Sequence, residues 1–352
     1  MATFITNAGR SVRLSFRQAL ERDCVTIVRK EIKGDPLLDF ARSTASGLSA
    51  SPRKLDCRFL YNGRGSELFD RITELPEYYL TRTESVILAS SARLIREIAG
   101  PATLVELGSG SSAKTDYLLR AWLAHGCPVR YIPVDISEEA LSGACDAINH
   151  DHPCVRIVGL NTDYGAAFPL LREVSPVLVL FLGSTIGNFD REELPRFLGS
   201  LSNALSPGDF FLIGIDLVKD RSIIEAAYND SSGVTAEFTR NLFARMNREL
   251  ESGIDLSAVE HVARYDPEKG QMEILARFTR EETIRVAPLG QSFTVAAGEE
   301  VLVEISRKFR LDAFLPSLQG FGFATEQVFT DERRWFALVL ARKTAGAVVS
   351  SQ

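Results

Sequence analysis

The stretch that decides the fold is T-L-V-E-L-G-S-G-S-S-A-K-T, residues 103–115. A mostly apolar run comes first, a glycine-containing turn follows, and residues 112–126 then have the pattern of an amphipathic helix. A strand that enters a helix through a tight glycine turn is typical of α/β proteins that bind a ligand at this point. Gly108 and Gly110 would let the backbone approach that ligand closely, because glycine carries no side chain.

Strand and helix patterns alternate through the middle of the chain. The predicted strands cover residues 103–108, 129–135, 155–160, 177–183 and 209–216, and the predicted helices cover 81–98, 112–126, 137–148 and 191–205. This alternation predicts an α/β fold with a doubly wound parallel sheet and helices on both of its faces. The helix at 81–98 has Thr81 and Glu84 at the spacing of a capping box.

After residue 226 the pattern changes. Residues 226–250 contain a helix with an apolar stripe, and residues 260–306 alternate with period two, which predicts a hairpin that turns near 267–270. A further pair of strands within residues 325–342 would close the parallel sheet with an antiparallel hairpin. We therefore expect a second, smaller α+β module beside the doubly wound sheet.

The nine residues V-L-V-E-I-S-R-K-F, 301–309, predict a strand with an unusual polar face. Side chains alternate along a strand, so Leu302, Glu304 and Ser306 should share one face. An edge strand with one solvated face would have this pattern. The alternative is that the carboxylate and the hydroxyl point into a pocket and bind a group that has both a donor and an acceptor.

Composition narrows the class of protein. The chain has 352 residues, 45% of them hydrophobic and 24% charged, with a formal net charge of −6. The negative charge argues against broad binding to nucleic acid or to anionic membranes. The five cysteines include no CxxC pair and the four histidines form no HExxH motif, so we expect no metal. No membrane span or signal peptide is predicted, so we expect a cytoplasmic protein.

The glycine turn favours a ligand without a pyrophosphate. The nicotinamide fingerprint requires a third glycine near position 113, where the sequence has alanine. An acid before the glycines, Glu106, and a further acid after the third strand, Asp163, fit S-adenosylmethionine better. A nicotinamide oxidoreductase remains an alternative at this point.

Each part of S-adenosylmethionine has a candidate partner in the sequence. Asp135 ends the second strand, where an acid can bind both ribose hydroxyls. Asp163 can accept from the adenine amine, with Tyr164 beside it to stack on the ring. Lys114 and the start of the following helix would favour the carboxylate of the methionine end.

Several stretches outside the glycine turn are more specific. They are F-L-Y-N-G-R-G-S-E-L-F-D-R-I-T-E-L-P-E-Y-Y-L-T-R-T-E (59–84), F-L-G-S-T-I-G-N-F (181–189), G-I-D-L-V-K-D (214–220) and A-A-Y-N-D-S-S-G-V-T-A-E-F-T-R-N (226–241). Together with V-E-I-S-R-K-F, they resemble the histidine Nα-methyltransferases of ergothioneine biosynthesis, which trimethylate histidine to hercynine. The resemblance runs from about residue 55 to residue 342.

The resemblance implies a Rossmann-like class I methyltransferase sheet and a discontinuous substrate-binding domain. Residues 83–217 plus 309–345 would bind S-adenosyl-L-methionine and release S-adenosyl-L-homocysteine. Residues 31–82 plus 218–308 would bind the amino acid, and residues 1–30 would be an N-terminal extension. We expect a monomer whose partner is a small molecule.

The resemblance also implies roles for individual residues. Tyr78, Gly108, Lys114, Asp135, Asp163 and Tyr164 would line the cofactor site. Tyr61 and Asn188 would bind the α-amino group and orient its lone pair, and they are the candidate catalytic residues. Tyr228 would bind the carboxylate with Asn188, and Glu304 and Ser306 would bind the imidazole. Whether the proton leaves through Tyr61 or through water stays open.

Two positions depart from the family pattern. Asn62 stands where many relatives carry an acid, and Ile274 lies on a strand where some relatives carry a methionine. These differences keep two alternatives open: a sister methyltransferase that acts on another amino acid, such as a tryptophan derivative, and a silent binding protein with the same fold.

Overall fold

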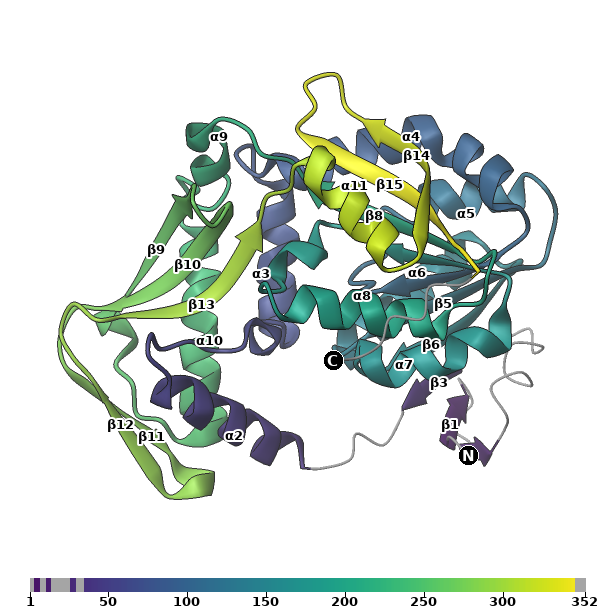
Figure 1. The fold of residues 1–352 in the computed structure, drawn as a ribbon. Coiled ribbons are helices and arrows are strands. Elements are labelled where there is room, and N and C mark those ends of the chain that lie inside the picture. The colour runs from purple at the N-terminus through teal and green to yellow at the C-terminus, as the bar shows by residue number, and fades with distance from the viewer. Residues whose placement is uncertain (1–2, 7–10, 14–25, 30–34, 346–352) are drawn as a thin grey trace. The chain divides into compact units, whose positions relative to one another are not determined.

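A computed structural model describes residues 3–6, 11–13, 26–29 and 35–345 (Figure 1). The chain divides into two compact units. Unit 1 contains Leu80–Leu217, the described residues from Phe309 onward and the described residues before position 32. Unit 2 contains the described part of 32–79 together with Val218–Lys308. Each unit therefore combines segments that are distant in sequence.

Unit 1 is built on a sheet with the order β14-β15-β8-β7-β4-β5-β6-β3-β1-β2. Its parallel centre consists of β4 (Thr103–Leu107), β5 (Val129–Asp135), β6 (Val155–Asn161), β7 (Val177–Phe181) and β8 (Phe210–Asp216). The hairpin of β14 (Phe323–Thr330) and β15 (Phe336–Lys343) adds to β8 in the antiparallel direction. The predicted doubly wound sheet and its closing hairpin are confirmed.

Helices cover both faces of this sheet. On one face, apolar residues of α7 (Tyr164–Leu171), α8 (Glu193–Ala204) and α11 (Leu311–Gly320) join the alternate strand residues in one buried cluster. On the other face lie α4 (Tyr79–Ala99) and α6 (Glu138–Asp151). Glycines make room for both: a Cβ on Gly159 would meet Leu141 of α6, and one on Gly214 would meet Glu84 of α4.

Two of the predicted helix starts in unit 1 are wrong. Helix α5 (Asp116–Leu123) begins four residues later than expected, because Ser112 has a φ of +54° and residues 112–115 form turns. Helix α4 begins at Tyr79, so Thr81 lies inside it and no capping box forms with Glu84. Glu84 instead has no exposed surface, and its partners, Gly183 and Lys114, follow β7 and β4 at the carboxyl edge of the sheet.

The N-terminal region contributes three short strands to the same sheet. They are β1 (Thr3–Thr6), β2 (Ser11–Arg13) and β3 (Thr26–Arg29). Strand β3 pairs in parallel with β6, and β1 pairs with both β3 and β2. The described residues of the predicted extension therefore add one strand in parallel pairing, β3, and two in antiparallel pairing, β1 and β2, to the sheet beyond β6.

Unit 2 combines helices with a three-stranded sheet. Its helices are α2 (Pro36–Ser49), α3 (Gly63–Glu74), α9 (Arg221–Ala226) and α10 (Val234–Leu250), and a separate hairpin is formed by β11 (Glu282–Val286) and β12 (Gln291–Val295). The sheet has the order β13-β10-β9, with β9 at Val259–Asp266, β10 at Gln271–Phe278 and β13 at Glu300–Arg307. The predicted hairpin between β9 and β10 is confirmed.

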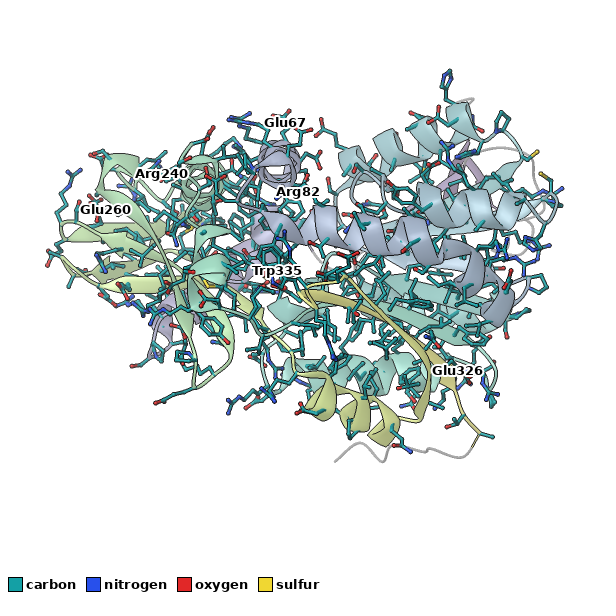
Figure 2. The ribbon with its side chains drawn as sticks, turned by 90° about the horizontal axis from the view of Figure 1, so that it is seen from above. Glu67, Arg82, Arg240, Glu260, Glu326 and Trp335 are labelled. Carbon is teal, nitrogen blue, oxygen red and sulfur yellow. The ribbon has the colours of Figure 1, made fainter. Side chains whose placement is uncertain are left out.

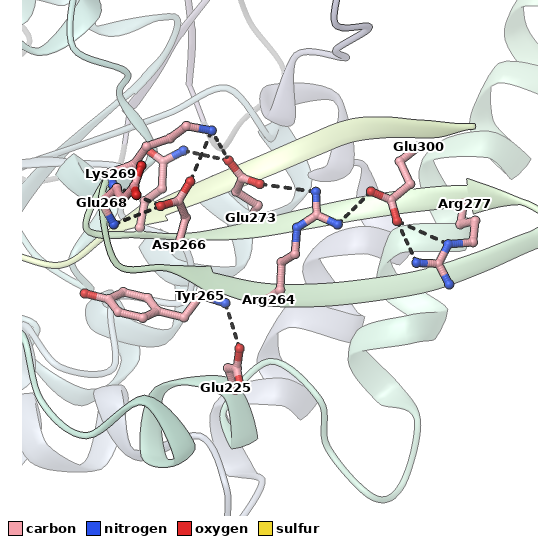
Figure 3. A network of polar contacts seen from close by, with 10 residues as sticks. Glu225, Arg264, Tyr265, Asp266, Glu268, Lys269, Glu273, Arg277 and Glu300 are labelled. Carbon is pink, nitrogen blue, oxygen red and sulfur yellow. Dashed lines mark hydrogen bonds and ion pairs between the residues drawn. The ribbon is translucent and has the colours of Figure 1, made fainter. Parts of the chain in front are cut away.

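Charged side chains tie the three strands of this sheet together (Figure 3). Glu300 on β13 accepts from Arg277 on β10 and from Arg264 on β9, each at 2.7 Å. Glu273 pairs with Lys269 at 2.7 Å. Other charged residues, such as Glu67, Arg240, Glu260 and Glu326, are exposed on the surfaces of their units (Figure 2).

A β-bulge interrupts the pairing of β13 with β10. Ile274 pairs with Glu304, whereas the next residue, Leu275, pairs with Leu302. Val303 is therefore the extra residue, and the simple alternation of faces stops there.

This bulge changes which side chains of β13 lie together. Cross-strand partners share a face, and Glu304 and Ser306 pair with Ile274 and Met272, which are two residues apart. Glu304 and Ser306 thus lie on one face, as predicted. The prediction that Leu302 lies with them is wrong, because its partner lies on the opposite face of β10.

Within the described residues, no helix is long and apolar enough to cross a bilayer, and no three metal-ligating side chains are grouped around a common centre.

Candidate active site

The predicted site residues fall into two sets, one in each unit. Unit 1 holds Gly108, Lys114, Asp135, Asp163, Tyr164 and Asn188. Unit 2 holds Tyr61, Tyr78, Tyr228, Glu304 and Ser306. Tyr78, which we assigned to the cofactor, thus belongs to the unit that carries the residues assigned to the amino acid.

The glycine turn after β4 is shaped by Asp135 at the end of β5. Its Oδ2 accepts from the amide of Gly110 at 2.9 Å, and its Oδ1 accepts from the amide of Ser137 at 2.8 Å. Burial raises the pKa of the Asp135 carboxyl, and these amide donors oppose the shift. Each carboxylate oxygen still has acceptor capacity, so Asp135 is able to accept from a diol as well.

Gly108 shows why the turn requires glycine. Its φ is +69°, and a Cβ built there would lie 2.8 Å from the hydroxyl oxygen of Tyr164. Gly108 is itself exposed, so the bare backbone forms an open surface beside Tyr164. The neighbouring Ser109 has a buried Oγ with no hydrogen-bond partner among the described residues.

A buried acid, Glu106, is linked by hydrogen bonds to residues that follow the glycine turn. Glu106, only 3% exposed, accepts from the hydroxyl of Thr115 at 2.7 Å and from the hydroxyl of Tyr131, which also bonds with Ser112 at 2.8 Å. Burial raises the pKa of Glu106 to about 7, although the two hydroxyl donors favour its charged form. The sequence singles out Glu106 as the acid that precedes the glycines. In the structure it links β4 to Thr115 directly and to Ser112 through Tyr131.

A second buried carboxylate, Glu84, ties three elements of unit 1 together. Its oxygens accept from the amide of Gly183, which follows β7, at 2.9 Å, and they form an ion pair with the ammonium of Lys114. Lys114 was predicted to lie at the start of a helix and to face the methionine carboxylate. It lies in the turn before α5, and its pairing with Glu84 places it close to Gly183.

Asp163 and Tyr164 lie at the start of α7. Asp163 is exposed and caps the helix, because its Oδ1 accepts from the amide of Ala166 at 2.9 Å. The ring of Tyr164 packs edge-on against Phe181 and Phe197, at centroid distances of 5.5 and 6.1 Å. The packing brings the Tyr164 hydroxyl to the glycine turn.

Asn188 ends the short 3₁₀ helix η3 (Thr185–Asn188), directly after β7. It is half-buried. Since β7 neighbours β4, Asn188 belongs to the same carboxyl edge of the sheet as the glycine turn, which is where parallel sheets bind ligands.

In unit 2, aromatic rings form a continuous chain of edge-to-face contacts. Tyr61 packs on Phe69 and Phe238 at 5.6 and 5.5 Å, Phe69 packs on Tyr78 at 6.3 Å, and Tyr78 packs on Tyr228 at 6.2 Å. These contacts fix the ring planes, because each ring edge meets the face of the next. Unit 2 therefore brings the three predicted tyrosines together.

Tyr228 and Ser306 form a buried triangle with Lys308. The Tyr228 hydroxyl donates to Ser306 Oγ at 2.8 Å. The Lys308 ammonium donates to Tyr228 Oη at 2.8 Å and to Ser306 Oγ at 2.9 Å. All three side chains belong to residues that are at most 7% exposed. The sequence assigns Tyr228 to the carboxylate end of the substrate and Ser306 to its ring, so their direct bond is not expected. The bond uses the one hydrogen of the Tyr228 hydroxyl, so in this arrangement the hydroxyl cannot also donate to a carboxylate.

The two departures from the family pattern have structural explanations. Asn62 caps α3: its Oδ1 accepts from the amide of Gly65 at 2.8 Å and from Asn241 at 2.9 Å. Both bonds use Asn62 as an acceptor, a role that a carboxylate also fills. Ile274 is buried and is the cross-strand partner of Glu304, so its side chain lies on the face of the polar pair.

Sequence reasoning missed Glu84 and Lys308. Leu80, Glu84, Leu88 and Ser91 recur at helical spacing, so Glu84 lies on the buried stripe of α4, which is a visible signal for a partnered acid. Lys308 follows Ser306 by two residues, so the period of the strand pattern already placed them on a common face.

The residues of the turn fit an S-adenosyl ligand. Gly108 presents bare backbone, Asp135 has acceptor capacity for a diol, and the orphaned hydroxyl of Ser109 lies in the same turn. No basic cluster or third glycine provides for a pyrophosphate at this turn. These features favour the ligand that we predicted over a dinucleotide.

Comparison with known families gives a match over nearly the whole chain. A family described as histidine-specific, S-adenosylmethionine-dependent methyltransferases matches residues 40–343.

Individual relatives agree with this match. A histidine N-alpha-methyltransferase of Mycolicibacterium smegmatis is 42% identical over 85% of this chain and 94% of its own length. One from Mycobacterium tuberculosis is 40% identical over 87% of this chain and 95% of its own length. Ergothioneine biosynthesis protein 1 of Neurospora crassa is 38% identical over 54% of this chain and 22% of its own length.

Proposed function

Because this chain belongs to the family of S-adenosylmethionine-dependent, histidine-specific methyltransferases, we propose that it trimethylates the α-amino group of L-histidine to form hercynine in ergothioneine biosynthesis. The observation that carries the proposal is the family match over residues 40–343, which includes every residue that we assigned to the two ligands. A nicotinamide oxidoreductase does not explain this match, and a silent binding protein is less well supported because the chain keeps every polar residue that we assign to the site.

Unit 1 would bind the methyl donor. Asp135 accepts from the ribose hydroxyls, Asp163 accepts from the adenine amine, and Tyr164 lies against Gly108 to shape the wall of the site. Lys114, which is paired with Glu84, contributes positive charge beside Gly183 for the carboxylate of the methionine end. When bound, S-adenosylmethionine supplies an electrophilic methyl group on a sulfonium.

Unit 2 would bind the amino acid through the residues that it carries, and the role of Asn188 of unit 1 at the α-amino end stays a prediction from the family resemblance. Glu304 accepts the ring N–H of histidine and Ser306 donates to the other ring nitrogen, since both residues lie on one face of β13. Tyr61 and Tyr78 are held by edge-to-face packing. Their rings suit an amine that becomes a permanent cation, because aromatic faces attract ammonium groups.

The chain's own contribution to catalysis is orientation and desolvation. The α-amino group of a free amino acid is largely protonated at neutral pH, so it must lose a proton before it attacks. Hydrogen bonds from Tyr61 and Asn188 would orient the lone pair toward the methyl group. Positioning accelerates the reaction mainly by holding the amine nitrogen about 3 Å from the methyl carbon, in line with the bond to sulfur.

Mass spectrometry of the products tests this proposal. Each reaction contains the purified chain, S-adenosylmethionine and one amino acid. The amino acids tested are histidine, tryptophan, 4-dimethylallyltryptophan and others. We expect histidine to yield mono-, di- and trimethylated species that converge on the trimethylated one.

Two results would contradict the proposal. One is the absence of any methylated histidine under conditions in which the chain binds S-adenosylmethionine by calorimetry. The other is faster methylation of a tryptophan derivative than of histidine, which would make the chain a sister enzyme with another substrate.

A further inference from the structure

The buried triangle of Tyr228, Ser306 and Lys308 uses up the acceptor capacity of Ser306. A serine hydroxyl has one donor hydrogen and two acceptor lone pairs. Ser306 Oγ accepts from the Tyr228 hydroxyl at 2.8 Å and from the Lys308 ammonium at 2.9 Å. Both lone pairs are therefore occupied by residues of the same unit.

The hydrogen of Ser306 is the part of the hydroxyl that remains. It donates to no acceptor among the described residues, and Ser306 is only 5% exposed. A buried donor without a partner raises the free energy of the folded protein. A ligand that presents an acceptor at this place recovers that free energy, and a ligand that presents a hydrogen does not.

Lys308 is the residue that fixes this direction. An ammonium has three donors and no acceptor, so neither Ser306 nor Tyr228 can donate to it. Its bond to Tyr228 Oη also directs the phenol hydrogen away from the ammonium and toward Ser306. The backbone holds Lys308 in place as well, since its amide donates to the carbonyl of Gly270 at 2.8 Å.

We propose that Lys308 is a positioning residue that, together with Tyr228, makes Ser306 a donor only, so that the site selects amino acids whose ring presents an unprotonated nitrogen to Ser306. This inference rests on the proposed function and adds the polarity of the contact. Histidine would then bind as the neutral ring whose bare nitrogen faces Ser306 and whose N–H faces Glu304. The imidazolium form has an N–H at both positions and lacks the required acceptor.

The test compares substrates that differ only by a ring nitrogen. The first pair is 3-(4-thiazolyl)alanine and 3-(3-thienyl)alanine. The second compound differs from the first only in that C–H replaces the ring nitrogen, while the sulfur keeps its position. The isomers 3-(5-thiazolyl)alanine and 3-(2-thienyl)alanine make the same comparison at the other ring position. For each pair, kcat/KM for methylation and the binding constant in the presence of S-adenosylhomocysteine are measured.

In the unchanged protein, we expect one of the two pairs to favour the thiazole by about 10- to 100-fold, the value of a buried hydrogen bond whose donor is otherwise unpaired. Ser306→Ala should reduce this preference to about onefold, since the donor is gone.

Variants of Lys308 separate positioning from simple packing. Lys308→Met keeps the length of the side chain but frees one lone pair of Ser306, so the hydroxyl can turn. The thiazole preference should fall to within about threefold, while Lys308→Arg, which keeps donors, should restore most of it. Lys269→Met is the matched control. Lys269 is an exposed lysine of the same unit that pairs with Glu273, so its loss should leave the thiazole preference unchanged.

Tyr228→Phe provides a second test that does not remove a buried charge. It takes away the hydrogen that fills the other lone pair of Ser306, so the thiazole preference should again fall. A preference that stays the same in both Lys308→Met and Tyr228→Phe would overturn the inference, as would the lack of any preference in the unchanged protein. Methylation of histidine in the same assay distinguishes these outcomes from failure of the proposed function, which would remove the histidine product itself.

Discussion

The two units hold their predicted ligand groups by different means. In unit 1, carboxylates accept from main-chain amides: Asp135 accepts from Gly110 in the glycine turn, and Glu84 accepts from Gly183 after β7. In unit 2, the corresponding groups are side-chain hydroxyls and aromatic rings, which are held by one another and by Lys308.

This difference matches the ligands that we assign to each unit. A methyl donor is the same molecule in every reaction, and backbone geometry with a few acids is sufficient to bind it. An amino-acid substrate has to be distinguished from nineteen similar molecules, and side chains with a defined donor or acceptor direction provide the discrimination. Changes in unit 2 should therefore alter the choice of substrate, and changes in unit 1 should alter stability and donor binding.

Glu304→Ala gives the largest expected effect. We expect kcat/KM for histidine to fall at least thousandfold, about 4 kcal/mol, because a ring N–H would lose its buried acceptor. The affinity for S-adenosylmethionine, measured by calorimetry, should change by no more than about twofold.

Glu300→Ala is the matched control for that substitution. Glu300 is on the same strand, and its partners are Arg264 and Arg277 on the surface of the sheet (Figure 3). Its loss should lower stability slightly and leave histidine turnover intact. Normal histidine turnover in Glu304→Ala would refute the assignment of the imidazole site.

Glu84→Gln should weaken unit 1 strongly. The substitution leaves the Lys114 ammonium without its buried counter-charge, which should lower the free energy of unfolding by about 3 kcal/mol. Urea unfolding measures this loss, and calorimetry should show weaker binding of S-adenosylmethionine. Glu97→Gln on the same helix removes an exposed i,i+4 partner of Arg93 and should cost less than about 0.5 kcal/mol. Equal losses in the two variants would mean that Glu84 does not organise the unit.

Glu106→Gln should change how stability depends on pH. Burial raises the pKa of Glu106 from 4.5 to about 7 in the folded protein. Between these values the folded state keeps a proton that the unfolded state has lost, so stability falls as pH rises from 4.5 to 7 and then levels off. The full fall is at most about 3 kcal/mol at 1.36 kcal/mol per pKa unit.

Glutamine cannot titrate, so the Glu106→Gln protein should lack this fall. Urea unfolding of both proteins at a series of pH values between 4.5 and 8 measures the difference. Parallel curves for the two proteins would show that Glu106 is not protonated in the folded state at neutral pH.

Two glycines of one turn offer the finest comparison. Gly108→Ala puts a Cβ 2.8 Å from the Tyr164 hydroxyl in a backbone with a φ of +69°, and it should cost about 2 kcal/mol and weaken donor binding. Gly110→Ala has a φ of +49° but nothing within 4 Å of the new Cβ, so it should cost only about 1 kcal/mol. Thermal unfolding and calorimetry measure both. An equal effect on donor binding would mean that the contact with Tyr164 has no role in the site.

The fold could be predicted well from the sequence because its signals are local. The run at 177–183 has no polar residue before its glycine. Such a run is typical of a central strand of a parallel sheet, which is buried on both faces. The late start of α5 could not be predicted in the same way. It goes with the positive φ of Ser112 and with the bond from the Thr115 hydroxyl to Glu106, a contact across nine residues that the pattern of apolar positions does not contain.

The candidate site divides along the same line. The shared face of Glu304 and Ser306 was predicted from a period-two pattern, but the bulge at Val303 could not be predicted, because it depends on the register with β10. Lys308 was overlooked because a lysine after a strand is usually solvated. Its bonds to Tyr228 and Ser306, 80 and 2 residues away, help to offset the cost of its burial.

The division of unit 2 into two chain segments has a consequence for how the protein is made. Helix α3 packs on α10, and Asn62 bonds to Asn241, a residue 179 positions later. A ribosome that has released the first of these segments must synthesise most of the central sheet before the second appears. During that interval the early helices expose apolar faces, and they are the part of the nascent protein that most needs protection from aggregation.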